Sequence, residues 1–516
     1  MAIGIEQLQI LDIGKGGANE KIAAHLINDN QSAPPDASTL PLKNCHTDEV
    51  GKIVKRNGYS VYTGPITISG SPDIVLDEIC GIYQYNKFNG NAFEIVVGSN
   101  GTDQKIVDIS TPASPVDITG ALTITDDTRA IFATVADTLL ITTEHRDAPA
   151  KWTGTGNCAA LGGTPPVGKY VVEFFNYAFI ANTSANPERI YWSALFNPES
   201  WTTGSDFYRA PDAITGVVRR SDSLIIFTKS TITVARFTGD AITPFDFQRL
   251  DTNVGCASHR SIVNIEGVLH WMGGDAHLYR MVDYKPERLT EAIPKTIASL
   301  NQGAFSISCA TDHRELRQYW CAVTNDSSEV NDFVLVLDYL NNELFLYDGM
   351  EINAMTNWID SSGNTKTYFG DRSGRIFLTN SGTSDYPGGT QTAIDFFRWT
   401  KKFPMSGPNL FKRLRKVKFT VNNGGNYSSL CDVSVDSGAT GGVALEINHN
   451  GGGDLLGSTW VLGTSRLGRI DDVPRFVDVC LIGKYFQFKF YNNAFSQPLE
   501  ISDFELHYQT LGVGRN

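Results

Sequence analysis

A pair of short apolar segments joined by a polar turn recurs along the middle of the sequence. Counted between the starts of the first segments, the pattern returns every 38 to 51 residues, close to the ~40–50 residues of one propeller blade. The seven pairs are Phe93–Val97 with Lys105–Ile109, Leu139–Thr142 with Ala150–Trp152, Tyr177–Ala181 with Arg189–Trp192, Leu224–Phe227 with Ile232–Phe237, Val268–Trp271 with His277–Val282, Tyr319–Val323 with Phe333–Leu337, and Tyr368–Gly370 with Arg375–Leu378.

The turns of this repeat are rich in Gly, Asn and Asp, as in Gly273-Gly274-Asp275. These residues tolerate the positive φ angles that tight hairpins require. A single blade cannot bury both of its faces, whereas blades packed around an axis can. We therefore predict an all-β fold with a β-propeller of six or seven blades, seven being the number of pairs. A long array of β-sandwiches is the alternative.

The sequence pattern changes near residue 396. Beyond it, Phe486, Phe488 and Phe490 alternate with polar residues, which is typical of a strand with one buried face. Glycine-rich segments such as Gly451–Gly453 are predicted to be loops between such strands. We expect three parts: an extended N-terminal arm over residues 1–50, the propeller over 51–395, and a C-terminal β-sandwich of jelly-roll type over 396–516.

Composition narrows the functional classes. The 516-residue chain has a formal net charge of −13, which repels nucleic acid, although a channel that DNA slides through could be acidic. The eight cysteines are scattered without a CxxC pair, which favours free thiols in a protein made in a reducing cytoplasm. Neither a secretion signal nor an apolar run of about 18 residues is present, so no membrane insertion is expected.

The motifs that could carry chemistry are weak. Cys256-x-x-His259 and Cys309-x-x-x-His313 are single pairs, whereas a structural zinc site needs four ligands. Gly154–Ala159 fits G-x-G-x-x-A, but glycines and prolines follow it where the phosphate-binding helix should begin. No G-x-S-x-G nucleophile motif occurs. The sequence therefore predicts no catalytic residue, no metal site and no cofactor.

The strongest charge signal is a basic run within residues 396–431, a stretch without any acidic residue. Its members are Arg398, Lys401, Lys402, Lys412, Arg413, Arg415, Lys416 and Lys418. On a regular strand, one face would carry Phe411, Arg413, Arg415, Val417 and Phe419, and the other Lys412, Leu414, Lys416 and Lys418. We predict that Lys412, Arg413, Arg415, Lys416 and Lys418 contact an acidic partner or passing DNA. A solvated strand face is the alternative.

Two stretches resemble a known family. The first runs from Leu40-Pro41-Leu42-Lys43-Asn44-Cys45 to Gly58-Tyr59. The second contains Asn186-Pro187-Glu188-Arg189-Ile190-Tyr191-Trp192-Ser193 and continues into Asn197-Pro198-Glu199-Ser200-Trp201. Both are similar to the tail hub, or nozzle, proteins of short-tailed bacteriophages, also called packaged-DNA stabilisation proteins. The order of an arm, a propeller and a C-terminal β-domain agrees with that family.

The resemblance implies a structural virion protein of the phage tail. Members form a hexameric ring below the portal and adaptor proteins, extend the DNA channel and close it after packaging. They also carry tail fibres, spikes or a needle, and take part in DNA ejection. No catalytic residue is implied.

The main alternative function is a propeller lectin or glycoside hydrolase that acts on surface polysaccharide. Aromatic residues such as Trp192, Trp201, Trp271 and Trp320 could stack on sugars, although at this spacing they fit the cores of blades better. A host-side propeller scaffold that binds other proteins is a further alternative. The sequence does not distinguish these by itself.

Overall fold

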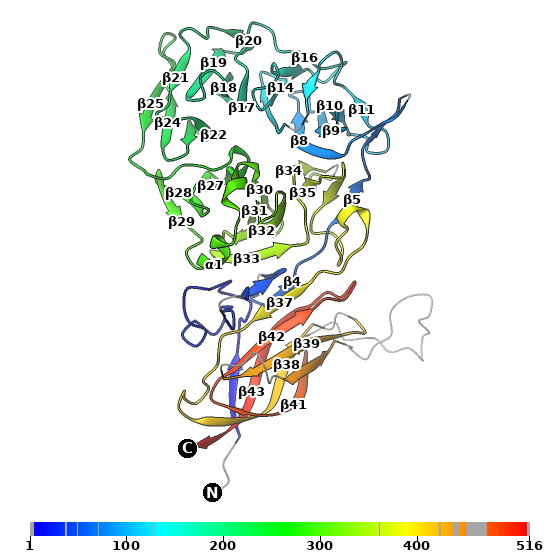
Figure 1. Ribbon diagram of the computed structural model, residues 1–516, viewed down its shortest axis with the longest axis vertical. Helices are drawn as coiled ribbons and strands as arrows, with labels where there is room; N and C mark the ends of the chain where they lie inside the picture. Colours follow the sequence, from blue (N-terminus) through cyan, green and yellow to red (C-terminus); the bar gives the residue numbers. More distant parts are fainter. Residues whose placement is uncertain are drawn as a thin grey trace.

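The computed structural model describes residues 5–36, 39–48, 50–70, 72–126, 128–360, 362–422, 425–436, 443–449 and 472–512. These residues form an all-β fold, as predicted, with one short α-helix and three short 3₁₀ helices among them. Figure 1 shows a ring of sheets and, beside it, a second β-body at whose far end the first and last described residues lie. The segment Gly451–Gly453 lies outside the described residues.

Seven sheets of the described chain form the propeller, which confirms the predicted fold. Blade 1 consists of β8 (Glu78–Asn86), β9 (Ala92–Ser99), β10 (Asp103–Asp108), β11 (Val116–Asp117) and β12 (Ile124–Thr125). Blade 2 consists of β13 (Ala130–Val135), β14 (Thr138–Thr143), β15 (Ala150–Trp152) and β16 (Ala159–Ala160). Blade 3 consists of β17 (Gly168–Phe174), β18 (Tyr177–Thr183), β19 (Arg189–Ala194), β20 (Asn197–Trp201) and β21 (Phe207–Arg209).

The remaining four blades complete the ring. Blade 4 consists of β22 (Ile214–Arg220), β23 (Ser223–Thr228), β24 (Ile232–Phe237) and β25 (Phe245–Arg249), and blade 5 of β26 (Val263–Ile265), β27 (Val268–Met272), β28 (Leu278–Val282) and β29 (Lys285–Arg288). Blade 6 consists of β30 (Cys309–His313), β31 (Gln318–Thr324), β32 (Asn331–Asp338) and β33 (Glu343–Asp348). Blade 7 consists of β34 (Ala354–Ile359), β35 (Thr365–Gly370) and β36 (Ile376–Leu378) together with the distant strand β5 (Ser60–Thr63). The seven predicted segment pairs correspond to the two middle strands of each blade.

Strand β5 closes the ring by joining the last blade. Val61 pairs with Phe377 and Thr63 with Ile376, so a segment near the N-terminus becomes the outermost strand of blade 7. Tyr59, just before β5, is 2% exposed and packs edge-on against Phe377 with ring centroids 5.1 Å apart. Gly58 permits this close approach, because a Cβ there would lie 1.8 Å from the carbonyl oxygen of Ser384.

Two further sheets form the second body. One contains β1 (Glu6–Ile10), β3 (Cys45–Thr47), β4 (Ile53–Lys55), β43 (Glu500–Gly512), β38 (Phe411–Val421) and β41 (Val473–Gly483); the other contains β2 (Leu42–Lys43), β37 (Phe396–Trp399), β42 (Phe486–Asn492), β39 (Ser428–Val435) and β40 (Val443–Asn448). Their buried faces share aromatic contacts. Phe488 of β42 packs against Phe504 of β43 at 5.2 Å, and Phe490 against Phe419 of β38 at 6.0 Å. The jelly-roll topology stays a prediction.

The N-terminal segment contacts both bodies. Strands β1 and β4 pair with β43, whereas the backbone N–H of Ala18 donates to the carbonyl of Leu344 in blade 6. The Glu20 carboxylate accepts the backbone N–H groups of Lys295 and Thr296, at the start of helix α1 (Pro294–Ala298), each at 2.9 Å. These contacts show which segments pack together. The predicted division at residues 50 and 395 stays a prediction.

The segment from Asn186 to Trp201 forms a hairpin of β19 and β20. Trp192 packs against Phe245 of blade 4, with ring centroids 5.4 Å apart. Trp271 and Trp320, 0% and 3% exposed, lie inside the core. Trp192 therefore packs between blades 3 and 4, and Trp271 and Trp320 pack within the interior of the propeller.

Tyr59→Ala is expected to lower the free energy of unfolding by about 3–5 kcal/mol, because it removes a buried aromatic side chain from the closing strand. Val61→Ala is the matched control, since Val61 is 38% exposed on the same strand, and a change below about 1 kcal/mol is expected there. Urea unfolding monitored by tryptophan fluorescence measures both. Equal effects of the two substitutions would show that β5 does not depend on this packing.

Candidate functional site

The predicted basic residues lie on β38, between β41 and β43 in the six-stranded sheet. Strand β38 contains a bulge: Leu414 pairs with Tyr508 and Lys416 with His507, so Arg415 has no partner position on β43. A bulge shifts the alternation of side chains by one residue. Leu414 and Val417 are therefore both buried. The prediction that side chains alternate strictly between the two faces of this strand is wrong beyond Leu414.

Lys412 points away from the outer face. It is 0% exposed, and its Nζ donates to the backbone carbonyls of Gly407 and, at 2.8 Å, Lys484. Burial lowers the pKa of its ammonium group below the usual value. Lys412 thus fastens two loops at the end of the sheet.

Two of the outer basic residues have acidic neighbours on the flanking strands. Lys418 Nζ lies 3.2 Å from Glu505 of β43, and Lys416 Nζ lies 3.4 Å from Asp478 of β41. Arg415, which is exposed, donates to the side-chain oxygen of Gln509 at 2.9 Å. Exposed ion pairs are weak, about 0–1 kcal/mol. The acidic complement expected from another molecule is therefore supplied partly by this chain.

The first three residues of the basic run, Arg398, Lys401 and Lys402, contact the N-terminal segment. Lys401 Nζ lies 2.6 Å from Asp29. Arg398, 1% exposed, donates to the carbonyl of Asn30 at 3.0 Å, and Lys402 Nζ donates to the carbonyl of Pro35 at 3.5 Å. These three cations are therefore occupied within the protein.

The outer face of this sheet also exposes apolar side chains. Phe476 is 57% exposed, Ile482 48% and Ile5 64%. A hollow of about 460 Å³ is lined by Ile5, Arg415, Lys416, Phe476, Asp478 and His507, among others. Mixed charge around apolar side chains is typical of protein contacts rather than of phosphate-backbone contacts. This β38 face, defined as Arg413, Arg415, Lys416, Lys418 and Phe476, is the surface to which the sequence prediction applies.

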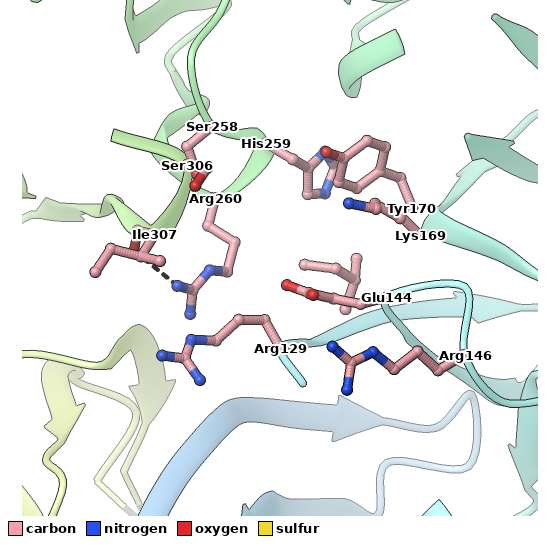
Figure 2. A pocket seen from close by; sticks show the side chains of 11 residues that line it. Arg129, Glu144, Arg146, Lys169, Tyr170, Ser258, His259, Arg260, Ser306 and Ile307 are labelled. Atoms are coloured by element: carbon pink, nitrogen blue, oxygen red, sulfur yellow. Dashed lines mark hydrogen bonds between the residues drawn. The ribbon is translucent and has the colours of Figure 1, made fainter. Parts of the chain in front are cut away.

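A second cluster of charge lies inside the propeller. Figure 2 shows a pocket of about 330 Å³ into which Arg129, Arg146, Lys169 and Arg260 project around Glu144. Tyr170, Ser258, His259, Ser306 and Ile307 complete most of its wall. The side chains come from blades 2 and 3 and from the 3₁₀ helices His259–Ser261 and Gln302–Ile307. This group is called the channel pocket below.

Two of the channel-pocket arginines are held in place by the protein. Arg260 donates to the backbone carbonyls of Asn353 and Ile307, both at 2.8 Å, and the second of these bonds is drawn in Figure 2. Arg129 NH1 lies 3.0 Å from the Glu78 carboxylate. Burial lowers the pKa of the Arg260 guanidinium, and the nearby Arg129 charge lowers it further.

His259, which is half-buried, hydrogen-bonds and stacks within the wall of the pocket. Its Nδ1 accepts the backbone N–H of Val217 at 3.2 Å, and its ring stacks on Tyr170 at 4.7 Å. Burial lowers the pKa of His259 to about 4, so the ring is neutral near pH 7. Among the described residues, no group of three His, Cys, Asp or Glu side chains is arranged to hold a metal ion.

The sequence analysis missed the channel pocket. Its charged residues are spread from Arg129 to Arg260 and form no run. One usable signal was present: Arg129 directly precedes the inner strand β13 and Lys169 lies at the start of β17. Because the inner strands of all blades begin at the same end of the channel, charges at these positions meet in space.

Residues 84–305, which run from the inner strand of blade 1 to the helix before blade 6, match the family model described as "Bacteriophage P22 Gp10, beta-propeller". The resemblance to the phage stabilisation family is confirmed. The matched segment is less than half of the chain. No curated protein matches the sequence. Within the described residues, no helix is long and apolar enough to cross a membrane.

Arg415→Glu with Lys416→Glu is expected to block incorporation of the protein into phage particles, because it reverses the charge of two residues of the β38 face. The thermal unfolding of the protein should be unchanged, because both side chains lie on the outer face of the sheet. Arg249→Glu with Lys285→Glu is the matched control, since both are exposed on the propeller. Particle composition measured by mass spectrometry gives the result. Normal incorporation with normal DNA content would favour a solvated face, and normal incorporation with lost DNA would favour contact with DNA.

Proposed function

We propose that this protein is a structural component of a phage tail that helps to retain packaged DNA. The observation that carries the proposal is the match of residues 84–305 to the propeller of the P22 Gp10 family. In the proposed assembly, copies form a closed ring, hexameric by analogy with the family, below the portal and adaptor proteins. The ring extends and closes the DNA channel and anchors tail fibres, spikes or a needle.

The architecture supports a structural role. The last blade of the propeller is completed by β5, so pairing between distant parts of the chain closes the ring. The net charge of −13 disfavours tight adhesion to DNA, which suits a channel through which DNA must move. The β38 face is the proposed subunit or adaptor contact, because a closed ring needs a heterologous surface on each copy.

We also propose that the protein has no catalytic activity of its own. The lectin or glycosidase alternative relied on aromatic residues that could stack on sugars, but Trp271 and Trp320 are buried and Trp192 packs against Phe245. Incubation with host surface polysaccharide is expected to release no oligosaccharide. Turnover that is abolished by replacing one pair of carboxylates would contradict a purely structural role.

Particles assembled without this protein are expected to lose packaged DNA and to recover DNA retention when the purified protein is added before filling is complete. A physical reason is that the channel below the portal stays open without the ring. Nuclease-protected DNA per particle is the measurement. Full protection in its absence would contradict the proposed role in retention.

A further inference from the structure

We propose that the channel pocket is a binding site for a phosphate group, carried either by free phosphate or by a small phosphate ester. The site is formed by Arg146, Lys169 and Arg260, with Arg129 beside them. This inference concerns the propeller's interior and is independent of the proposed ring.

The charge balance of the pocket is the first argument. Four cationic side chains and one carboxylate line it, in a chain whose net charge is −13. Glu78 pairs with Arg129 from outside the lining. Within the described chain, Arg146 and Lys169 form no ion pair within 4 Å. An excess of about two positive charges in a half-enclosed space is unfavourable unless an anion joins it.

The second argument is that the guanidinium groups are already oriented. Two backbone carbonyls fix Arg260, and a guanidinium has five N–H donors. Donors therefore remain for a ligand. Rigid, planar donors suit phosphate and carboxylate oxygens, and side chains held in advance lose less entropy on binding. In Figure 2 the side chains of Arg146 and Lys169 point toward the same space from the opposite wall.

Glu144 is placed to tune this site. Its carboxylate lies among the cations in Figure 2, yet no ion pair of Glu144 within 4 Å is found in the described part of the protein. Glu144 and the adjacent His145 both have positive φ, 43° and 52°. Such backbone conformations cost free energy for residues other than glycine. The loop is held by Asp147, whose carboxylate accepts the Thr125 N–H at 2.9 Å.

The size of the pocket selects a small ligand. A volume of about 330 Å³ is at the lower end for small-molecule sites. It exceeds the need of one phosphate ion and leaves room for a sugar-sized group, but not for duplex DNA. A dianionic phosphate matches the excess of two positive charges better than a monocarboxylate does.

Isothermal titration calorimetry of the full chain at low ionic strength tests the proposal with inorganic phosphate, glucose 6-phosphate and glucose. We expect saturable binding of one or both phosphate compounds below about 10 mM and none of glucose. Tighter binding of the ester would identify an ester as the natural form, and tighter binding of the free ion would identify phosphate itself. Binding of glucose alone, or of neither phosphate compound, would overturn the proposal.

Three variants locate the site. Arg146→Ala and Lys169→Ala, which remove surface-accessible side chains, should each weaken phosphate binding at least about tenfold, the usual effect of losing a charge-assisted hydrogen bond. Glu144→Gln should strengthen binding, because it removes a like charge. Arg249→Ala is the matched control and should change nothing. Unchanged affinity in the first two variants, at unchanged melting temperatures, would place any binding elsewhere and overturn the assignment.

Discussion

A buried ion pair joins the propeller to the second β-body where two distant segments cross. Arg56, between β4 and β5, bonds both oxygens of Asp385 at 2.8 and 2.5 Å, and both side chains are 3% exposed. The same guanidinium donates to the side-chain oxygen of Asn44 and to the carbonyl of Asp348 at the end of blade 6. One side chain thus links the N-terminal segment, the propeller and the connection to the C-terminal strands.

Closure of the propeller and completion of the six-stranded sheet both depend on the position of Arg56. Residues that follow Arg56 become β5 and close blade 7, while the residues before it enter the six-stranded sheet as β4. Closure of the propeller and completion of that sheet are therefore coupled through about ten residues. A buried charge left without its partner costs about 3–5 kcal/mol of folding free energy. Neither β4 nor β5 can therefore shift without breaking the ion pair between Arg56 and Asp385. This coupling suits the structural role proposed for the protein.

Local patterns in the sequence predicted most of the fold, but neither the bulge in β38 nor the channel pocket. The two middle strands of each blade are long and apolar, so their regular spacing along the chain could be recognised in the sequence. Strand β5 was not predicted, because Ser60–Thr63 pairs with residues more than 300 positions away. The bulge at Arg415 has no local signature and moved Leu414 and Val417 to one face. The channel pocket arises only when Arg129, Lys169 and Arg260 meet around the axis.

Differential scanning calorimetry of the intact chain and of Asp385→Ala tests the coupling most directly. The account predicts one cooperative transition for the intact protein and two separated transitions for Asp385→Ala, since the crossing would no longer hold the propeller to the second body. Asp240→Ala, on an exposed loop, is the control and should unfold as the intact chain does. Two resolved transitions already in the intact protein, or a single unshifted transition in Asp385→Ala, would contradict the account.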